Sequence, residues 1–179
     1  MTTAPAPPVL VVFSGLPGVG KTTVARALAA ATGASYLRID TIEDALRRRG
    51  ETFAGPRGDL GYTVAYALAR DALLLGTSAI VDGVHGWPGA AALHEAARAE
   101  THATLLRVLL VCSDPAIHRA RVETRRAQAL DAHLPAWSDV RARGFHPDPT
   151  PHLTLDTATL PPPDAVARIR ARMTRPEAG

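Results

Sequence analysis

A glycine-rich stretch, GLPGVGKTT at residues 15–23, has the residue types and spacing that suit phosphate binding. It fits the pattern G-x-x-x-x-G-K-[ST], with Lys21 and Thr22 at the last two positions. Glycines let successive backbone N–H groups turn inward around phosphate oxygens, and a following helix adds the positive end of its dipole. Lys21 can reach β- and γ-phosphates, and Thr22 can offer its hydroxyl to Mg²⁺. The predicted nucleotide-binding residues of this stretch are Gly15, Leu16, Pro17, Gly18, Val19, Gly20, Lys21, Thr22 and Thr23.

Asp82 is a second candidate magnesium residue. It ends the apolar run SAIVD, where a protein with a phosphate loop usually keeps an acid that holds Mg²⁺ directly or through water. The alternative is an aspartate that only starts a helix. Gly83 follows instead of a glutamate that could activate water, which disfavours a hydrolysing motor. Lys21 is the only lysine, so the guanine-reading motif N-K-x-D of regulatory GTPases is absent as well.

The elements that must position these residues alternate between strands and helices. Strand-like runs cover residues 8–14, 35–39, 78–83, 103–112 and 152–157. Helical patterns cover about 21–31, 41–49, 59–76, 88–100, 114–130 and 163–173, and the glycine-rich residues 50–58 are expected to form a loop. This alternation predicts an α/β protein, a three-layer α/β/α P-loop NTPase fold around a five-stranded parallel sheet. We expect one domain over residues 9–179 after a disordered lead at 1–8.

Composition narrows the classes of protein. The first eight residues do not fit a signal peptide, and no apolar run approaches the roughly 20 residues of a membrane helix, so a cytoplasmic protein is expected. Cys112, the single cysteine, lies in an apolar run and is expected to be a buried, inert thiol. The formal charge is only +3 and aromatic residues make up 4%, so a nucleic-acid partner is not favoured.

With GLPGVGKTT on a small domain, residues 9–173 resemble the P-loop kinase group that includes gluconate kinases, chloramphenicol phosphotransferase, zeta toxins and polynucleotide 5′-kinases. The arginine-rich run HRARVETRRAQ and the following LPAW segment also resemble small bacterial proteins known as AAA-family ATPases. The resemblance implies ATP and Mg²⁺ as cofactors, a small-molecule hydroxyl acceptor as partner, and a monomer or homodimer.

The resemblance also assigns roles to residues outside the phosphate loop. In this group an aspartate just after the second strand often deprotonates the acceptor hydroxyl, and Asp40 occupies that position. The alternative is structural, because Asp40 and Glu43 also fit a capping box at a helix start.

The group closes an arginine-bearing lid, expected here at about residues 119–135, over the phosphates. Arg121 and Arg125 are four residues apart, so on a helix they share a face and could converge on one polyphosphate. The alternative is a solvated basic helix, which would also contain Arg119 and Arg126. The predicted catalytic residues are Lys21, Asp40, Arg121 and Arg125.

Other residues give weaker signals. Arg57 lies in the glycine-rich loop, where related kinases hold their acceptor. His85 and Trp87 follow the third strand at a ligand-binding edge, but a surface histidine is the favoured interpretation of His85. Tyr62 and Tyr66 share a helical face and are expected in the core. His146 and His152 lack metal-ligand spacing.

These features favour an ATP-dependent phosphotransferase that acts on a hydroxyl of a small metabolite or natural product. Two alternatives stay open at this point: a kinase for polynucleotide ends or nucleotide sugars, and a regulatory module that binds ATP and transfers nothing.

Overall fold

The computed structural model describes residues 6–53, 58–128 and 134–174. The strands within these residues are β1 (Val9–Ser14), β2 (Ser35–Arg38), β3 (Ala79–Asp82), β4 (Thr104–Val111) and β5 (Leu153–Asp156). The helices are α1 (Lys21–Thr32), α2 (Ile39–Arg47), α3 (Leu60–Leu74), α4 (Ala90–Thr101), α5 (Pro115–Gln128), α6 (Trp137–Ala142) and α7 (Pro162–Thr174).

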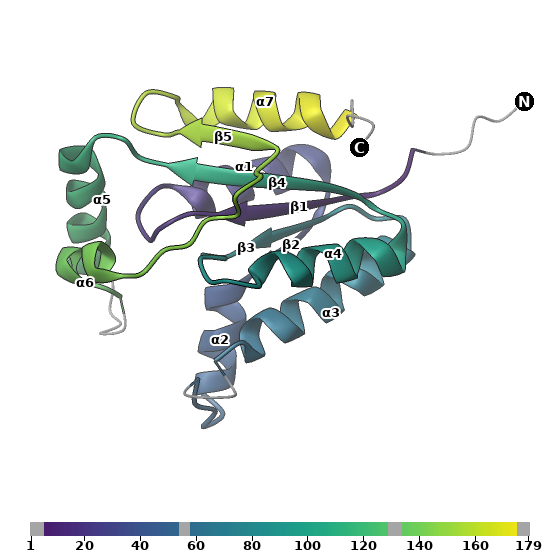
Figure 1. The fold of residues 1–179 in the computed structure, drawn as a ribbon, viewed down its shortest axis with the longest axis horizontal. Coiled ribbons are helices and arrows are strands. Elements are labelled where there is room, and N and C mark those ends of the chain that lie inside the picture. Colours follow the sequence, from purple (N-terminus) through teal and green to yellow (C-terminus); the bar gives the residue numbers. More distant parts are fainter. Residues whose placement is uncertain (1–5, 54–57, 129–133, 175–179) are drawn as a thin grey trace, which may run out of the picture.

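The five strands form one parallel sheet in the order β2-β3-β1-β4-β5. Helices α1 and α7 lie along one face, and α3 and α4 lie along the other (Figure 1). All strands run toward the end of the molecule where α5 and α6 stand (Figure 1). The predicted α/β fold with three layers is therefore confirmed, and α5, which carries most of the expected lid, lies with α6 at the carboxyl ends of the strands, where parallel sheets bind ligands.

The central strand β1 is buried on both faces, as its continuous apolar sequence predicts. Val11 and Phe13 pack with α1 and α7, whereas Leu10 and Val12 pack with α3 and α4. Each fully buried side chain of this size contributes about 1.5–3 kcal/mol to folding. Gly15, the first residue of the phosphate loop, therefore follows a strand that is fixed by packing on both faces.

The structure differs from the sequence expectations at two helices. Helix α2 begins at Ile39, two residues earlier than predicted. The short helix α6 was not predicted, because six residues are too few to show helical periodicity. At its start the backbone N–H of Ala136 donates to Asp139 Oδ2 at 2.8 Å, a cap that depends on the local turn.

Parts of the sequence expectations fall on residues 1–5, 54–57 and 129–133. The first belong to the expected lead, the second include Arg57, and the third belong to the expected lid, and all lie outside the described residues. Among the helices that are described, none has the length and apolar character needed to cross a bilayer.

Candidate functional site

The phosphate-loop motif connects β1 to α1 at the carboxyl edge of the sheet. Gly15, Gly18 and Gly20 all have positive φ angles, of 138°, 87° and 96°. Gly20 is the N-cap residue of α1 and makes no side-chain cap, so the first-turn N–H groups of this helix have no side chain capping them. Such an N-terminus favours an anion, which is the geometry the motif predicted.

Two of these glycines are also required by close packing. A Cβ atom on Gly15 would lie 2.3 Å from the carbonyl oxygen of Leu110 in β4. One on Gly18 would lie 2.4 Å from Val122 Cγ2 in α5. His118 of the same helix lies against the loop, with Nε2 2.8 Å from the Pro17 carbonyl oxygen. The phosphate loop is thus held between the sheet and the lid helix.

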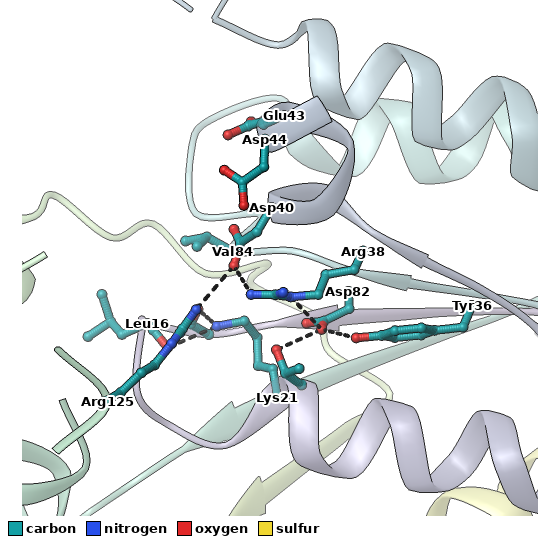
Figure 2. Close-up of polar contacts among 12 residues, drawn as sticks. Leu16, Lys21, Tyr36, Arg38, Asp40, Glu43, Asp44, Asp82, Val84 and Arg125 are labelled. Atoms are coloured by element: carbon teal, nitrogen blue, oxygen red, sulfur yellow. Dashed lines mark hydrogen bonds and ion pairs between the residues drawn. The ribbon is translucent and has the colours of Figure 1, made fainter. Parts of the chain in front are cut away.

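Lys21 lies inside the loop that it follows. Its Nζ donates to the carbonyl oxygens of Gly15 at 2.8 Å and Leu16 at 2.9 Å (Figure 2). Burial lowers the pKa of Lys21 from 10.5 to about 8, and the charge of Asp82 opposes part of that shift. The ammonium is therefore desolvated and hydrogen-bonded to neutral carbonyls, so a phosphate would give it a partner of opposite charge.

The two predicted magnesium residues meet although they are far apart in the sequence. Thr22 Oγ1 donates to Asp82 Oδ2 at 2.9 Å. Asp82 ends β3, and its side chain is only 2% exposed. A hydroxyl and a carboxylate are oxygen donors of the kind that Mg²⁺ uses while it keeps several waters. The donor set therefore fits Mg²⁺ better than a metal that prefers nitrogen or sulfur.

Two neighbours of Asp82 were missed in the sequence. The Tyr36 hydroxyl donates to Asp82 Oδ2 at 2.8 Å, and Arg38 Nε lies 4.0 Å from the same oxygen (Figure 2). Burial and the Asp82 charge raise the pKa of Tyr36, which keeps its hydroxyl protonated as a donor. Tyr36 and Arg38 both lie on β2, which pairs with β3. Because residues two apart on a strand point to the same face of the sheet, this spacing was the sequence signal that could have identified them.

Asp40 lies in the first turn of α2, at the mouth of the site. Its Oδ2 bonds Arg38 Nη2 and lies 3.5 Å from Arg125 Nη2 (Figure 2). The capping alternative is wrong, because the N-cap position belongs to Arg38 and no side chain caps the helix. Glu43 bonds Arg47 instead. The early start of α2 puts Asp40 inside the helix, where its charge interacts favourably with the dipole.

The two predicted lid arginines reach different places. Arg125 extends toward Asp40, and its charge is close enough to lower the pKa of Lys21. Arg121 instead bonds Thr157 just after β5, with Nη1 2.9 Å from Oγ1 and Nη2 2.9 Å from the carbonyl oxygen. The Thr157 hydroxyl also donates to the Val19 carbonyl at 2.7 Å. Arg121 and Arg125 therefore contact different parts of the site in this structure and do not converge on one point.

Arg119 and Arg126 are exposed, as expected for a solvated basic helix. Arg119 forms an exposed ion pair with Glu123, four residues later. Arg126 is exposed on the same helix. Their charges contribute to the local field but neither reaches a residue of the phosphate loop through any described contact.

Arg143 is a further basic residue near the site that the sequence did not single out. It follows α6, and its charge, like that of Arg125, lowers the pKa of Lys21. Helix α6 packs on α5, where Trp137 meets His118 edge to face at 5.0 Å. The arginine-rich composition hid this residue, because nineteen arginines among 20 basic residues leave no single one conspicuous.

The favoured surface position of His85 is wrong. Its side chain is 1% exposed, with Nδ1 2.9 Å from the Phe13 carbonyl and Nε2 3.0 Å from the Tyr66 hydroxyl. A positive φ of 44° lets the chain turn the ring inward, and burial lowers the pKa of His85 to about 3. Tyr62 and Tyr66 are buried as predicted, and Trp87 lies against Tyr62.

Two smaller expectations also have outcomes. Cys112 is half-buried rather than buried, with Sγ 3.6 Å from Arg121 Nη1, because β4 ends one residue before it. His152 contacts Arg107. Within residues 6–53, 58–128 and 134–174, no group of three or more histidine, cysteine or acidic residues could hold a metal ion.

Solved structures with a similar fold include several kinases. A candidate kinase from Chloroflexus aurantiacus has a TM-score of 0.76 and 22% identity over 94% of this chain and 97% of its own. The Mycobacterium tuberculosis APS kinase in complex with AMPPNP and APS has a TM-score of 0.72 and 17% identity, over 94% of this chain and 99% of its own. A gluconokinase from Sinorhizobium meliloti has a TM-score of 0.63 and 19% identity, over 96% of this chain and 94% of its own. At these identities the likeness shows the fold.

Sequence comparison gives the family. No curated protein matches the chain significantly. The family model described as AAA domain matches residues 10–147, a span that includes the phosphate loop, Asp40, Asp82 and α5. Because that span is well over half of the 179 residues, the chain belongs to the AAA domain family, and its fold is the one shared with P-loop kinases.

Proposed function

We propose that the protein is an ATP-dependent phosphotransferase that moves the γ-phosphoryl group of ATP to a hydroxyl of a small metabolite or natural product. The observation that carries the proposal is the position of Asp40. Its carboxylate lies within 3.5 Å of Arg125, a lid arginine whose charge also acts on the buried Lys21 of the phosphate loop. A nucleotide site thus has a carboxylate beside it, which a module that only binds ATP does not need.

The phosphate loop would hold the nucleotide. Backbone N–H groups of residues 15–23 and the α1 N-terminus would bind the phosphates, and the Lys21 ammonium would leave the Gly15 and Leu16 carbonyls for a phosphate oxygen. Thr22 and Asp82 would hold Mg²⁺, which when bound supplies positive charge to the phosphate oxygens. Tyr36 would keep the Asp82 carboxylate oriented toward Thr22 through its 2.8 Å hydrogen bond.

Asp40 would act as the general base. The acceptor oxygen would form a bond to the γ-phosphorus while the bond from that phosphorus to the bridging oxygen breaks, which releases ADP. The proton of the acceptor hydroxyl would pass to the Asp40 carboxylate. Phosphoryl transfer depends mostly on positioning and charge stabilisation, so a carboxylate that accepts the proton of the acceptor hydroxyl would be a sufficient contribution.

Arg125 would change partners during the reaction. It is tied to Asp40 by an exposed ion pair, a contact of little strength in water. The triphosphate would offer Arg125 more negative charge and would free Asp40 to accept a proton. Arg121 would support the nucleotide from the other side of the loop, through Thr157.

A screen of acceptors tests the proposal. Sugars, antibiotics, nucleosides and DNA ends would be compared by acceptor-dependent ATP consumption, with the phosphorylated product identified by mass. We expect one class of small molecules with a hydroxyl group to stimulate ADP release, and Asp40→Asn to lower the stimulated rate roughly 100-fold or more. Asp44→Asn is the matched control, because Asp44 lies on the same helix and, among the described residues, its carboxylate pairs only with the exposed Arg47. ATP binding with no acceptor-dependent ADP release would favour the regulatory module instead.

A further inference from the structure

A pocket of about 180 Å³ lies beneath α4, and Ser14, the residue before the phosphate loop, is among its lining residues. Its floor includes Val12 of β1 and Arg107 of β4, and its cover comes from residues 87–91 and 146–149. None of the residues proposed for phosphate, magnesium or acceptor chemistry lines it. His85, whose Nδ1 lies 2.9 Å from the Phe13 carbonyl oxygen, forms part of its wall.

The side chain that defines this pocket is His94. It is 2% exposed, yet neither ring nitrogen has a hydrogen-bond partner among the described residues. A buried polar group without a partner costs about 1–3 kcal/mol, so such groups are normally satisfied by protein, water or ligand. Burial lowers the pKa of His94 to about 4, so at neutral pH the ring presents one donor and one acceptor.

Two further groups in the pocket are incompletely bonded. Arg107 Nε has no acceptor among the described residues, and Asp148 Oδ2 has no hydrogen-bond donor there, although it lies 3.2 Å from Arg107 Nη1. His94, Arg107 and Asp148 all line the pocket, and the unpartnered atoms of these residues comprise donors on Arg107 and His94 and acceptors on His94 and Asp148. Hydroxyl groups, which both donate and accept, match such a mixed set.

The charges around the pocket disfavour ionic ligands. Arg107 is already paired with Asp148 and lies 3.6 Å from Glu95, so its charge is compensated. An anion would meet the Asp148 carboxylate, and a cation would meet the guanidinium. We propose that this pocket binds a neutral, polyhydroxylated small molecule through His94, Arg107 and Asp148, with Trp87 as an apolar wall.

The pocket volume limits the size of that molecule. Water occupies about 30 Å³, so the space corresponds to roughly six waters. Drug-sized ligands fill pockets of about 300–1,000 Å³, so a short polyol or a single sugar ring suits this one. Binding to this pocket does not require phosphoryl transfer, so it can be measured without a nucleotide.

Erythritol and its carboxylate counterpart erythronate are suitable probes for the full chain. We expect erythritol to shift the His94 ring nitrogen resonances and the backbone amides of the non-proline residues in 87–91 and 146–149 saturably, with a Kd of about 1 mM. Erythronate should bind more weakly. Absence of saturation at about one hundred times that concentration, equal or tighter binding of erythronate, or shifts confined to other residues would overturn the proposal.

Variants connect the binding to the named side chains. His94→Phe keeps a planar ring against Tyr66 and removes both nitrogens, so erythritol affinity should fall at least about tenfold. Glu100→Gln on the same helix is exposed and should leave it unchanged. Should His94→Phe fail to fold, Asp148→Asn tests the same site, with an expected loss of about fivefold. Unchanged affinity in a folded variant of either kind would show that the probe binds elsewhere.

Discussion

The phosphate loop and the lid helix α5 lie against each other, yet different kinds of contact fix them. The loop residues are held by buried contacts, such as the Lys21 ammonium on two backbone carbonyls and Thr22 on the 2%-exposed Asp82. Helix α5 packs on the loop through the buried His118 and Val122, but its Arg125 side chain is held only by an exposed ion pair with Asp40 among the described contacts. Buried, directional contacts preform a site, whereas exposed pairs exchange partners at little cost. We infer that the nucleotide side is rigid and that the lid side adjusts to ligands.

The largest expected effect separates these two regions. Replacement of both Arg121 and Arg125 by alanine should slow turnover by roughly 10³-fold, because arginines that stabilise charge in phosphoryl transfer have effects of this size. Thermal stability should change far less. Kinetics with the identified acceptor and thermal unfolding measure the two quantities, and Arg126→Ala serves as an exposed control on the same helix.

The single arginine variants sharpen the comparison. Arg125→Ala should reduce turnover with little change in melting temperature, because its ion pair is exposed. Arg121→Ala should also lower the melting temperature, because two hydrogen bonds to Thr157 are lost. Turnover within about twofold of wild type in the double variant would mean that α5 is only a solvated basic helix.

Asp40→Asn tests the acceptor side alone. The amide cannot accept the proton, so turnover should fall roughly 100-fold or more while ATP binding is retained. Stability should stay near wild type, because Asp40 is half exposed and caps no helix. Near-normal phosphorylation of the true acceptor by this variant would refute the base assignment, and Asp44→Asn should match wild type throughout.

Lys21→Ala tests the rigid side. Hydrogen bonds to charged groups contribute about 1.5–3 kcal/mol, so ATP·Mg²⁺ affinity should fall between about tenfold and a hundredfold. The fold should persist, because the variant removes a desolvated charge from the interior. Calorimetry gives the affinity and circular dichroism the fold. Unchanged affinity in the folded variant would overturn the nucleotide assignment.

The smallest effect is a pH dependence of the same interaction. Lys21 has a pKa of about 8 in the native protein against an ordinary value of 10.5 in the unfolded chain, so the unfolded chain binds more protons between these values. Stability should therefore rise with pH from about 8 to 10.5 as the buried charge is lost. ATP binding needs the charged form, so affinity should fall above that native pKa, by up to about tenfold per pH unit and by less in total than in Lys21→Ala. Titration calorimetry across this range should show no such trend in Lys21→Ala.

The same contrast explains which parts of the site could be predicted from the sequence. The phosphate loop was predictable because its glycines and its flanking apolar strand are local requirements, and Asp82 was predictable because it ends a strand. The position of His85 was not predictable, since its burial depends on a hydrogen bond to Phe13, 72 residues earlier. The approach of Arg143 to Lys21 depends on α6, whose packing on α5 is a tertiary contact.

The sequence by itself determined the phosphate loop, the residues expected to hold Mg²⁺ and the order of the strands and of the helices other than α6, because apolar periodicity and glycine conformation act over a few residues. The tertiary structure decided where the charged side chains go. Arg121 and Arg125 share a helical face, yet one bonds Thr157 and the other approaches Asp40, since those partners come from β5 and α2. Long arginine side chains follow whichever acceptors the packed elements bring near, and only the assembled fold supplies them.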